Sequence, residues 1–131
     1  MKCDMYSIRH GYDKKKCLVH ARCCYTSDLM VATAQYLNVN GSDLFSGIRM
    51  STSHDDGKTW TEFEEQKGLL PIEDDKYTIV GCDATPIHHK KTDNILLLGH
   101  TAEYEKDSLH PTGRKRHTFY SVFDKKKKEF R

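Results

Sequence analysis

The sequence predicts an all-β protein made of short antiparallel strands. Glycine, proline and Asn or Asp clusters recur about every ten residues, and the runs between them are rich in Val, Ile, Thr, Tyr and Phe. No long run shows the apolar period of about 3.6 residues that an amphipathic helix requires. This pattern is typical of a sandwich, a barrel or a propeller, and no boundary between domains is evident.

The length and composition exclude two other classes of protein. The chain has 131 residues, the size of one ordinary domain, with 37% hydrophobic and 31% charged residues. No stretch approaches the roughly 18 apolar residues that a membrane-spanning helix needs. Seven Tyr, five Phe and one Trp are too many for a disordered, solvated chain. A folded domain without a membrane partner is expected.

The strands and turns can be placed in chain order. The expected strands are residues 17–24, 29–37, 44–53, 59–63, 85–89, 95–101 and 118–123. Residues that tolerate a positive φ lie between several of them, at Asn38-Val39-Asn40-Gly41, Asp55-Asp56-Gly57 and Lys91-Thr92-Asp93-Asn94. Residues 68–76, which include Pro71, are expected to form a long surface loop.

Charge is distributed unevenly along a chain whose net charge is only +2. An acidic stretch runs from Asp55 to Asp75, and a basic stretch runs from His110 to Arg131. A basic stretch can attract nucleic acid or anionic lipid. No groove-reading motif accompanies it, so a solvated hairpin tip is the preferred interpretation and no nucleic-acid partner is expected.

The cysteines and the first residues predict the compartment. The five cysteines are an odd number without the spacing of a disulfide framework: Cys3, Cys17, Cys23, Cys24 and Cys82. Reduced thiols in a cytoplasmic protein are therefore expected. The start, Met1-Lys2-Cys3-Asp4, is followed by no apolar signal segment. This supports a cytoplasmic location if Met1 is the natural start, and an extracellular one remains open if residues precede it.

One motif is specific. Residues 53–60 fit the pattern Ser-x-Asp-x-Gly-x-Thr-Trp at every fixed position, with Ser53, Asp55, Gly57, Thr59 and Trp60. Asp55 is placed to accept hydrogen bonds across the turn, and Ser53 can bond back to it. Gly57 permits the left-handed backbone of a tight hairpin. The indole of Trp60 can fill the gap between neighbouring sheets. These five residues have a structural role.

This pattern is the Asp-box, or BNR repeat, of sialidases and several other β-propeller families. The order of segments around it is also similar to sialidases: a strand with Arg22, a short apolar strand, an acid at Asp43, and a strand with Arg49 that enters the box. Residues 81–86 and 94–101 resemble the opening of the next blade, and 121–124 resembles a degenerate second box. From Tyr12 to its end, the chain resembles the sialidase (exo-α-sialidase, neuraminidase) family.

The resemblance implies a particular fold. It implies antiparallel β-propeller blades, about two of the six in a sialidase-like propeller. The first blade would span residues 12–66 with its box at 53–60, and the second 77–131 with a degenerate box near 121–130. Propellers close with about four to eight blades. The chain is therefore expected to be the N-terminal portion of a larger propeller, and its open sheet edges would favour self-association.

The resemblance also implies a chemistry. Sialidases are glycoside hydrolases that release terminal sialic acid with a tyrosine nucleophile, an exception among glycosidases. A glutamate activates the tyrosine, an aspartate is the acid/base, and three arginines bind the substrate carboxylate. Arginine suits this task because its planar fork meets a carboxylate with two parallel hydrogen bonds. The expected partner is a sialylated glycan or a related acidic sugar, and no cofactor is implied.

Two residues match the catalytic pattern directly. Arg22 corresponds to the first arginine of the clamp, although Cys23-Cys24 follow it instead of Ile-Pro. Asp43 corresponds to the acid/base aspartate. Each has an ordinary alternative. Arg22 would otherwise pair with a surface acid, and Asp43 would otherwise be a turn residue after Gly41-Ser42.

Four further residues are candidates for substrate binding: Arg49, Asp83, His20 and His100. A neutral imidazole can donate a hydrogen bond to a sugar, and Asp83 begins a strand that opens toward the expected pocket. The alternatives are a strand residue flanking the box for Arg49, a turn cap for Asp83, and semi-buried, satisfied imidazoles for the two histidines.

A complete catalytic set is not expected in this chain. The remaining arginines, the tyrosine and its glutamate would lie beyond it, and Glu103 and Tyr104 point to opposite faces of a strand. A zinc site at Cys17, His20 and Cys23 is disfavoured, because side chains on one strand alternate faces. We expect a sialidase-like hydrolase fragment that is inactive alone. The alternative is a non-catalytic Asp-box module that binds carbohydrate or protein.

Overall fold

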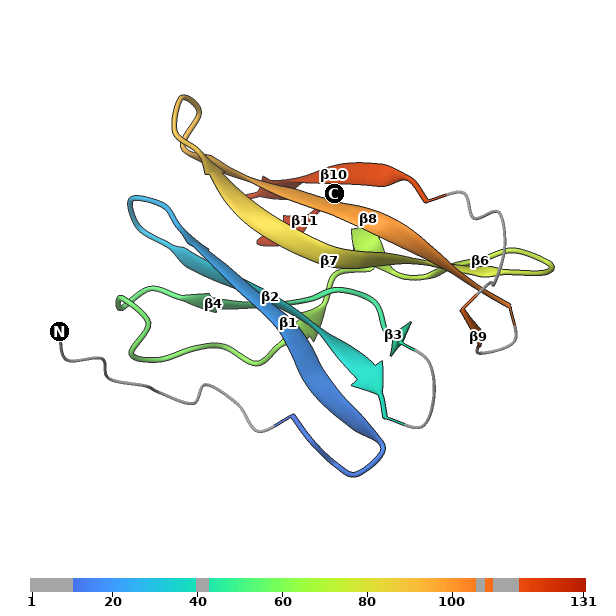
Figure 1. Cartoon of the computed structure of the whole chain (residues 1–131). Coiled ribbons are helices and arrows are strands. Elements are labelled where there is room, and N and C mark those ends of the chain that lie inside the picture. Colours follow the sequence, from blue (N-terminus) through green and yellow to red (C-terminus); the bar gives the residue numbers. More distant parts are fainter. Residues whose placement is uncertain (1–10, 40–42, 106–107, 110–115) are drawn as a thin grey trace, which may run out of the picture.

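The chain folds into two antiparallel β-sheets (Figure 1). The computed structural model describes residues 11–39, 43–105, 108–109 and 116–131. The predicted all-β, antiparallel class is confirmed. Within the described residues the one helical segment is a single 3₁₀ turn, η1 (Lys67–Leu69). The residues Cys3, Asn40, Gly41, Arg114 and Lys115, which the sequence singled out, lie outside the described ranges.

The first sheet has the strand order β1-β2-β4-β5, with β3 paired to β2. Its strands are β1 (Lys16–Tyr25), β2 (Met30–Asn38), β3 (Leu44–Phe45), β4 (Arg49–Ser53) and β5 (Glu64–Glu65). The second sheet has the order β11-β10-β8-β7-β6, with β9 paired to β8. Its strands are β6 (Ile72–Glu73), β7 (Thr78–His89), β8 (Asn94–Glu105), β9 (Ser108–Leu109), β10 (Thr118–Asp124) and β11 (Glu129–Phe130).

The expected strand at residues 59–63 is wrong. The backbone at Thr61 lies beside β4, but side-chain hydroxyls replace some of the backbone hydrogen bonds that would make it a strand. The Thr61 N–H donates to the Thr52 carbonyl at 3.0 Å, whereas the Thr52 N–H donates to the Thr61 hydroxyl and Ser51 Oγ donates to the Thr61 carbonyl. Hydroxyl groups compete in this way with regular pairing. The short strand in this part of the chain is β5 instead.

Two other boundaries differ from the sequence prediction. The expected strand 44–53 is interrupted after β3, because the hydroxyl of Ser46 accepts a hydrogen bond from the Tyr36 N–H and diverts the pairing. The expected loop 68–76 contains β6, which pairs with the start of β7 at Thr78 and Ile79. β7 therefore begins well before the predicted residue 85.

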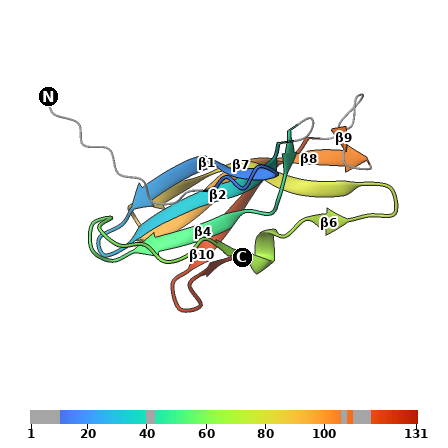
Figure 2. The ribbon, with the colours of Figure 1, turned by 90° about the horizontal axis from the view of Figure 1, so that it is seen from below.

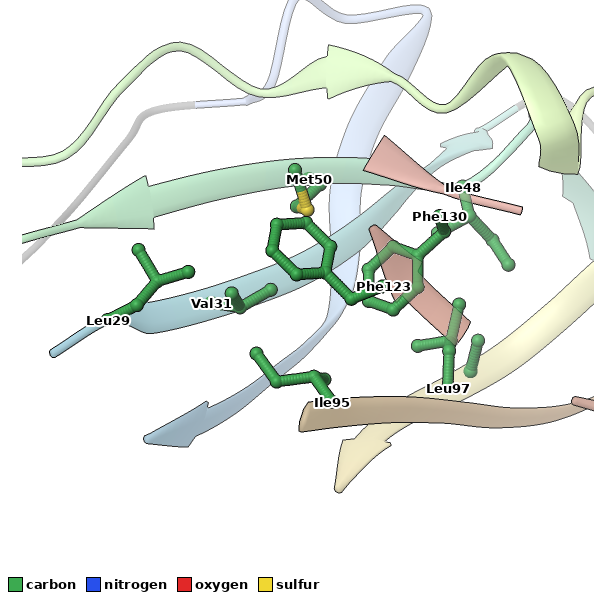
Figure 3. Packing of buried hydrophobic residues seen from close by; sticks show 9 residues of the cluster. Leu29, Val31, Ile48, Met50, Ile95, Leu97, Phe123 and Phe130 are labelled. Atoms are coloured by element: carbon green, nitrogen blue, oxygen red, sulfur yellow. The ribbon is translucent and has the colours of Figure 1, made fainter. Parts of the chain in front are cut away.

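The hydrophobic core lies between the two sheets (Figure 3). Val31 of β2 and Met50 of β4 point toward Ile95 and Leu97 of β8, and Phe123 of β10 lies among them. Phe123 is 2% exposed and meets Phe130 edge to face, with ring centroids 5.3 Å apart. Such a dense apolar contact fixes the sheets face to face.

The two sheets repeat one construction, in which the first two long strands are joined across a β-bulge. In β1, Val19 pairs with Gln35 and Arg22 pairs with Thr33, so two residues oppose one. In β7, Cys82 pairs with His100 and Thr85 pairs with Leu98 in the same way. The first bulged residues, His20 and Asp83, have φ values of 56° and 54°. Non-glycine residues rarely adopt such angles, so each bulge holds its first residue in an uncommon backbone conformation.

The residues of the predicted Asp-box form a closed hydrogen-bonded hairpin after β4. Asp55 accepts from the Ser53 hydroxyl at 2.8 Å, from the Thr59 N–H at 2.9 Å and from the Thr59 hydroxyl at 2.6 Å. The Gly57 N–H donates to Ser53 Oγ, and the Trp60 indole donates to the Gly57 carbonyl. Gly57 has a φ of 82°, as the sequence predicts.

The stability of this hairpin should depend on pH. The hydrogen bonds from Thr59 and Ser53 lower the pKa of Asp55 from 3.8 to about 2. A carboxyl with a lowered folded-state pKa stabilises the fold above pH 3.8, and this contribution is lost as the pH falls toward 2. We expect Asp55→Asn to lower the thermal midpoint at pH 6, and the difference from the wild type to shrink between pH 4 and pH 2. A constant difference across this range would contradict the assignment.

Candidate functional site

A cleft of about 450 Å³ lies where the two bulges meet. Its lining comes from segments far apart in the sequence: Val19, His20, Leu37, Asp43, Phe45, Cys82, Asp83, His100, Ala102, Tyr104 and Arg116. Strands β1 and β7 lie side by side here, as two views of the ribbon show (Figures 1 and 2). Its lining combines apolar side chains with carboxylate, imidazole and guanidinium groups, a composition that suits a small polar ligand.

The bulges place one cation, one anion and one imidazole together. Arg22 Nη2 lies 3.1 Å from Asp83 Oδ1, and His20 Nδ1 lies 3.6 Å from the same oxygen. His20 Nδ1 is buried and has no hydrogen-bond partner, and its ring stacks obliquely on Phe45 at 4.9 Å. A buried ring nitrogen without a hydrogen-bond partner is uncommon in proteins, and this one faces the Asp83 carboxylate.

Two buried polar side chains of β2 hold the bulge of β7. Gln35 is 2% exposed, donates to the carbonyls of Gly81 at 2.7 Å and Ser46 at 2.9 Å, and accepts from the Asp83 N–H at 3.1 Å. The Thr33 hydroxyl donates to the Ala84 carbonyl at 3.1 Å. Because these bonds satisfy the backbone at the bulge, they fix the direction of the Asp83 side chain.

Tyr104 holds the segment that carries Asp43. Its hydroxyl donates to the Asp43 carbonyl at 2.7 Å and accepts from the Phe45 N–H at 3.3 Å. Burial raises the pKa of this phenol well above its ordinary value. The Asp43 side chain remains exposed at the mouth of the cleft. The tyrosine is thus a structural anchor, and the carboxyl is the accessible group.

The structure brings together most of the residues predicted for the site. His20, Asp43, Asp83 and His100 line one cleft, and Arg22 contacts Asp83 beside it. Asp83 belongs to a bulge inside β7 and not to a turn, which corrects the alternative considered for it.

Arg49 is not among the side chains that line the cleft. It donates to Glu65 Oε1 at 2.8 Å and to the Phe63 carbonyl at 3.2 Å, and it lies over the Tyr36 ring. The box residues do not line the cleft either. Their role in the hairpin is local.

Sequence reasoning missed three contributors. Arg116 lines the cleft, although in the sequence it is one member of a basic stretch. Phe45 and Gln35 fall inside the expected strands 44–53 and 29–37, where the sequence predicts no further role for them. An amide inside the apolar run 29–37 is a usable signal, because buried polar side chains usually bond to buried backbone.

The cysteines of the described ranges are free thiols. In the described residues, no three His, Cys, Asp or Glu side chains gather as metal ligands, and Cys17, Cys23, Cys24 and Cys82 form no disulfide. Burial raises the pKa of Cys24 and of Cys82 to about 11, so both are protonated thiols at neutral pH. The described part of the chain also has no helix long and apolar enough to cross a membrane.

Comparison with known proteins gives no family for this chain. No family model, curated protein or solved structure matches it. The function has to be inferred from the residues of the hairpin and of the cleft.

Proposed function

We propose that this chain is the N-terminal part of a sialidase-like Asp-box propeller, whose parent protein hydrolyses terminal sialic acid or a related acidic sugar. The observation that carries the proposal is the cleft. His20, Asp43, Asp83 and His100 are four of the site residues that the sequence suggests, Asp43 through the resemblance to sialidases, and they line one cavity although the chain separates them widely.

Two features of the fold support the propeller. The box residues form the hairpin that their pattern implies, with Asp55 at its centre. The two sheets also share the pairing of two long strands across a bulge, as successive blades would. We propose that residues 12–66 and 77–131 are those blades. The turn between β10 and β11 keeps one box-like feature, because Asp124 accepts from the N–H groups of Lys126 and Lys127.

The cleft and the arginine beside it offer groups that suit an acidic sugar. Arg22 directs one N–H to the Ala21 carbonyl at 3.2 Å and one to Asp83, and its guanidinium carries five N–H groups in all. The remaining donors can bind a carboxylate, and Arg116 adds a second cation at the cleft. In this proposal Asp43 is the acid/base group, and the two histidines donate hydrogen bonds to sugar hydroxyls.

The chain alone is proposed to be inactive. Tyr104 is the tyrosine of the cleft, and its hydroxyl is already bonded to the Asp43 carbonyl and the Phe45 N–H. Its raised pKa makes it a poor nucleophile. Glu103 lies on the opposite face of the strand from this tyrosine. The same observation favours the second candidate function, a non-catalytic module that binds an acidic glycan.

Ligand binding tests the cleft. We expect sialic acid to bind the chain weakly in calorimetry, and Arg22→Ala to weaken binding by roughly tenfold, because it removes charge-assisted hydrogen bonds to the carboxylate. Arg131→Ala is the matched control. This arginine is also exposed and pairs with an aspartate, Asp124, at 3.5 Å, but Asp124 does not line the cleft, whereas the Asp83 that Arg22 contacts does. Equal loss of affinity in both variants would argue against the cleft.

A fluorogenic sialoside tests the catalytic part of the proposal. The isolated chain should release no phenol above the rate of the buffer. Release at the rate of a complete sialidase, abolished by Asp43→Asn, would show that the chain alone is an enzyme. The catalytic residues would then all lie within these 131 residues.

A further inference from the structure

Arg22 is already engaged by a carboxylate of the chain itself. Its Nη2 atom donates to Asp83 Oδ1 at 3.1 Å, and its Nη1 atom donates to the Ala21 carbonyl at 3.2 Å. The arginine and aspartate side chains are 42% and 41% exposed, so a carboxylate from solvent can reach the pair. Such a ligand has to share the guanidinium with Asp83 or to displace it, and either arrangement brings two negative charges close together. Binding of an acid therefore needs a compensating positive charge.

His20 stands beside Asp83 as a second partner. Its Nδ1 atom lies 3.6 Å from the same Oδ1 atom, a distance longer than a hydrogen bond. This nitrogen is buried and makes no hydrogen bond among the described residues, and the ring packs against Phe45. A neutral imidazole has one donor, whereas an imidazolium has two. A proton on Nδ1 would let His20 donate to Asp83 while Nε2 still donates to a sugar hydroxyl.

The fixed charges of the cleft and its edge balance among the described residues. The carboxylates of Asp43 and Asp83 are matched by the guanidiniums of Arg22 and Arg116. A ligand carboxylate adds one negative charge to this arrangement. The uptake of one proton would restore the balance.

The titratable groups of the lining single out His20 as the site of that proton. Burial raises the pKa of the Cys82 thiol to about 11 and raises the pKa of the Tyr104 phenol well above its ordinary value. Neither group changes its charge near neutral pH. The lining also holds the imidazoles of His20 and His100, and imidazoles change charge between about pH 5 and 8. Of these two, His20 is the one that faces a carboxylate among the described ion pairs.

We propose that Asp83 exchanges Arg22 for a protonated His20 when a carboxylate ligand binds, so that binding takes up one proton from solvent. This inference rests on the proposed function of the cleft and specifies how its affinity is regulated. The ligand carboxylate takes the guanidinium, and the proton goes to His20 Nδ1, which then donates to Asp83. By linkage, the affinity falls by up to about tenfold per pH unit wherever the bound cleft carries one more proton than the unbound cleft.

The two bulge positions allow conservative variants. His20 and Asp83 have φ values of 56° and 54°, and asparagine tolerates this backbone conformation. His20→Asn removes the imidazole, and Asp83→Asn removes the charge. His88→Asn is the matched control, because His88 Nε2 also faces an aspartate, Asp93 Oδ1 at 2.8 Å, but neither residue lines the cleft. The amide spectrum checks that each variant is folded.

Calorimetry with N-acetylneuraminic acid at pH 7, in buffers of different ionisation enthalpy, counts the protons taken up on binding. We expect at least about half a proton for the wild type and for His88→Asn, and close to none for His20→Asn and Asp83→Asn. Between pH 6 and pH 8 the affinity of the wild type should fall by about tenfold. That of Asp83→Asn should change by less than about twofold and should exceed the wild-type affinity at pH 8, because no internal carboxylate competes for Arg22.

The outcomes separate this inference from the proposed function. If the acid binds without proton uptake, or with equal uptake in the wild type and His20→Asn, the exchange of partners is wrong although the cleft binds an acidic sugar. Loss of uptake in His88→Asn would overturn the assignment to His20 as well. If the acid binds at no pH between 5 and 8, the proposed function fails and this inference fails with it.

Discussion

Replacing Gln35 by alanine is expected to lower the free energy of unfolding by about 3 kcal/mol and to disturb the cleft. The side chain is buried and bonds to Gly81, Ser46 and the Asp83 N–H. Its removal leaves buried backbone groups of both sheets without partners, and each such group costs about 1–3 kcal/mol. Denaturant unfolding measures the loss, and the amide resonance of Asp83 reports the bulge.

Gln66→Ala is the matched control. Gln66 is 4% exposed and accepts from the Phe130 N–H at 3.0 Å, but it touches neither bulge. We expect a smaller loss of stability and unchanged resonances for His20 and Asp83. If Gln35→Ala left the resonance of Asp83 in place, the bulge would not depend on this amide.

Replacing Phe123 by alanine should lower the free energy of unfolding by about 4 kcal/mol, the largest effect of a single substitution that we expect. Phe123 is 2% exposed and packs between the two sheets beside Phe130. The loss combines apolar area returned to water with the cavity left behind. Because it loosens the contact between the sheets, affinity for a ligand in the cleft should fall as well.

Tyr12→Ala serves as the comparison for Phe123→Ala. This aromatic side chain is 65% exposed, so its removal should change the free energy of unfolding by less than about 0.5 kcal/mol. Similar losses for the two substitutions would mean that Phe123 does not lie at the centre of the core.

The sequence could predict features that depend on neighbouring residues. Turn-forming residues indicated the approximate limits of most strands. The pattern from Ser53 to Trp60 predicted a hairpin, and in the structure its side chains bond across the turn. The strand expected at 59–63 failed because the hydroxyl of Thr61 takes a ladder position that backbone groups normally fill. The strand propensity of a residue does not show whether its hydroxyl will compete with the backbone for a hydrogen bond.

The bulges and the cleft could not be predicted in the same way. A bulge depends on which residue of the neighbouring strand lies opposite. The local sequences Val19–Arg22 and Cys82–Thr85 do not determine that register by themselves. The cleft needs Asp43, Asp83 and Arg116 to meet across the fold, so the sequence could nominate its members only through resemblance to a family or through the chemistry of single residues. Arg116 lacked that signal and was missed.

The proposed function requires that the cleft between the bulges binds an acidic sugar through its carboxylate. The most direct measurement is a ¹⁵N–¹H shift titration of the chain with N-acetylneuraminic acid and, separately, with its methyl ester. We predict that the acid shifts the amides of His20, Asp43, Asp83 and His100 but not those of the box hairpin, and that the ester binds at least about tenfold more weakly. Equal binding of acid and ester, or shifts confined to residues outside the cleft, would contradict the claim.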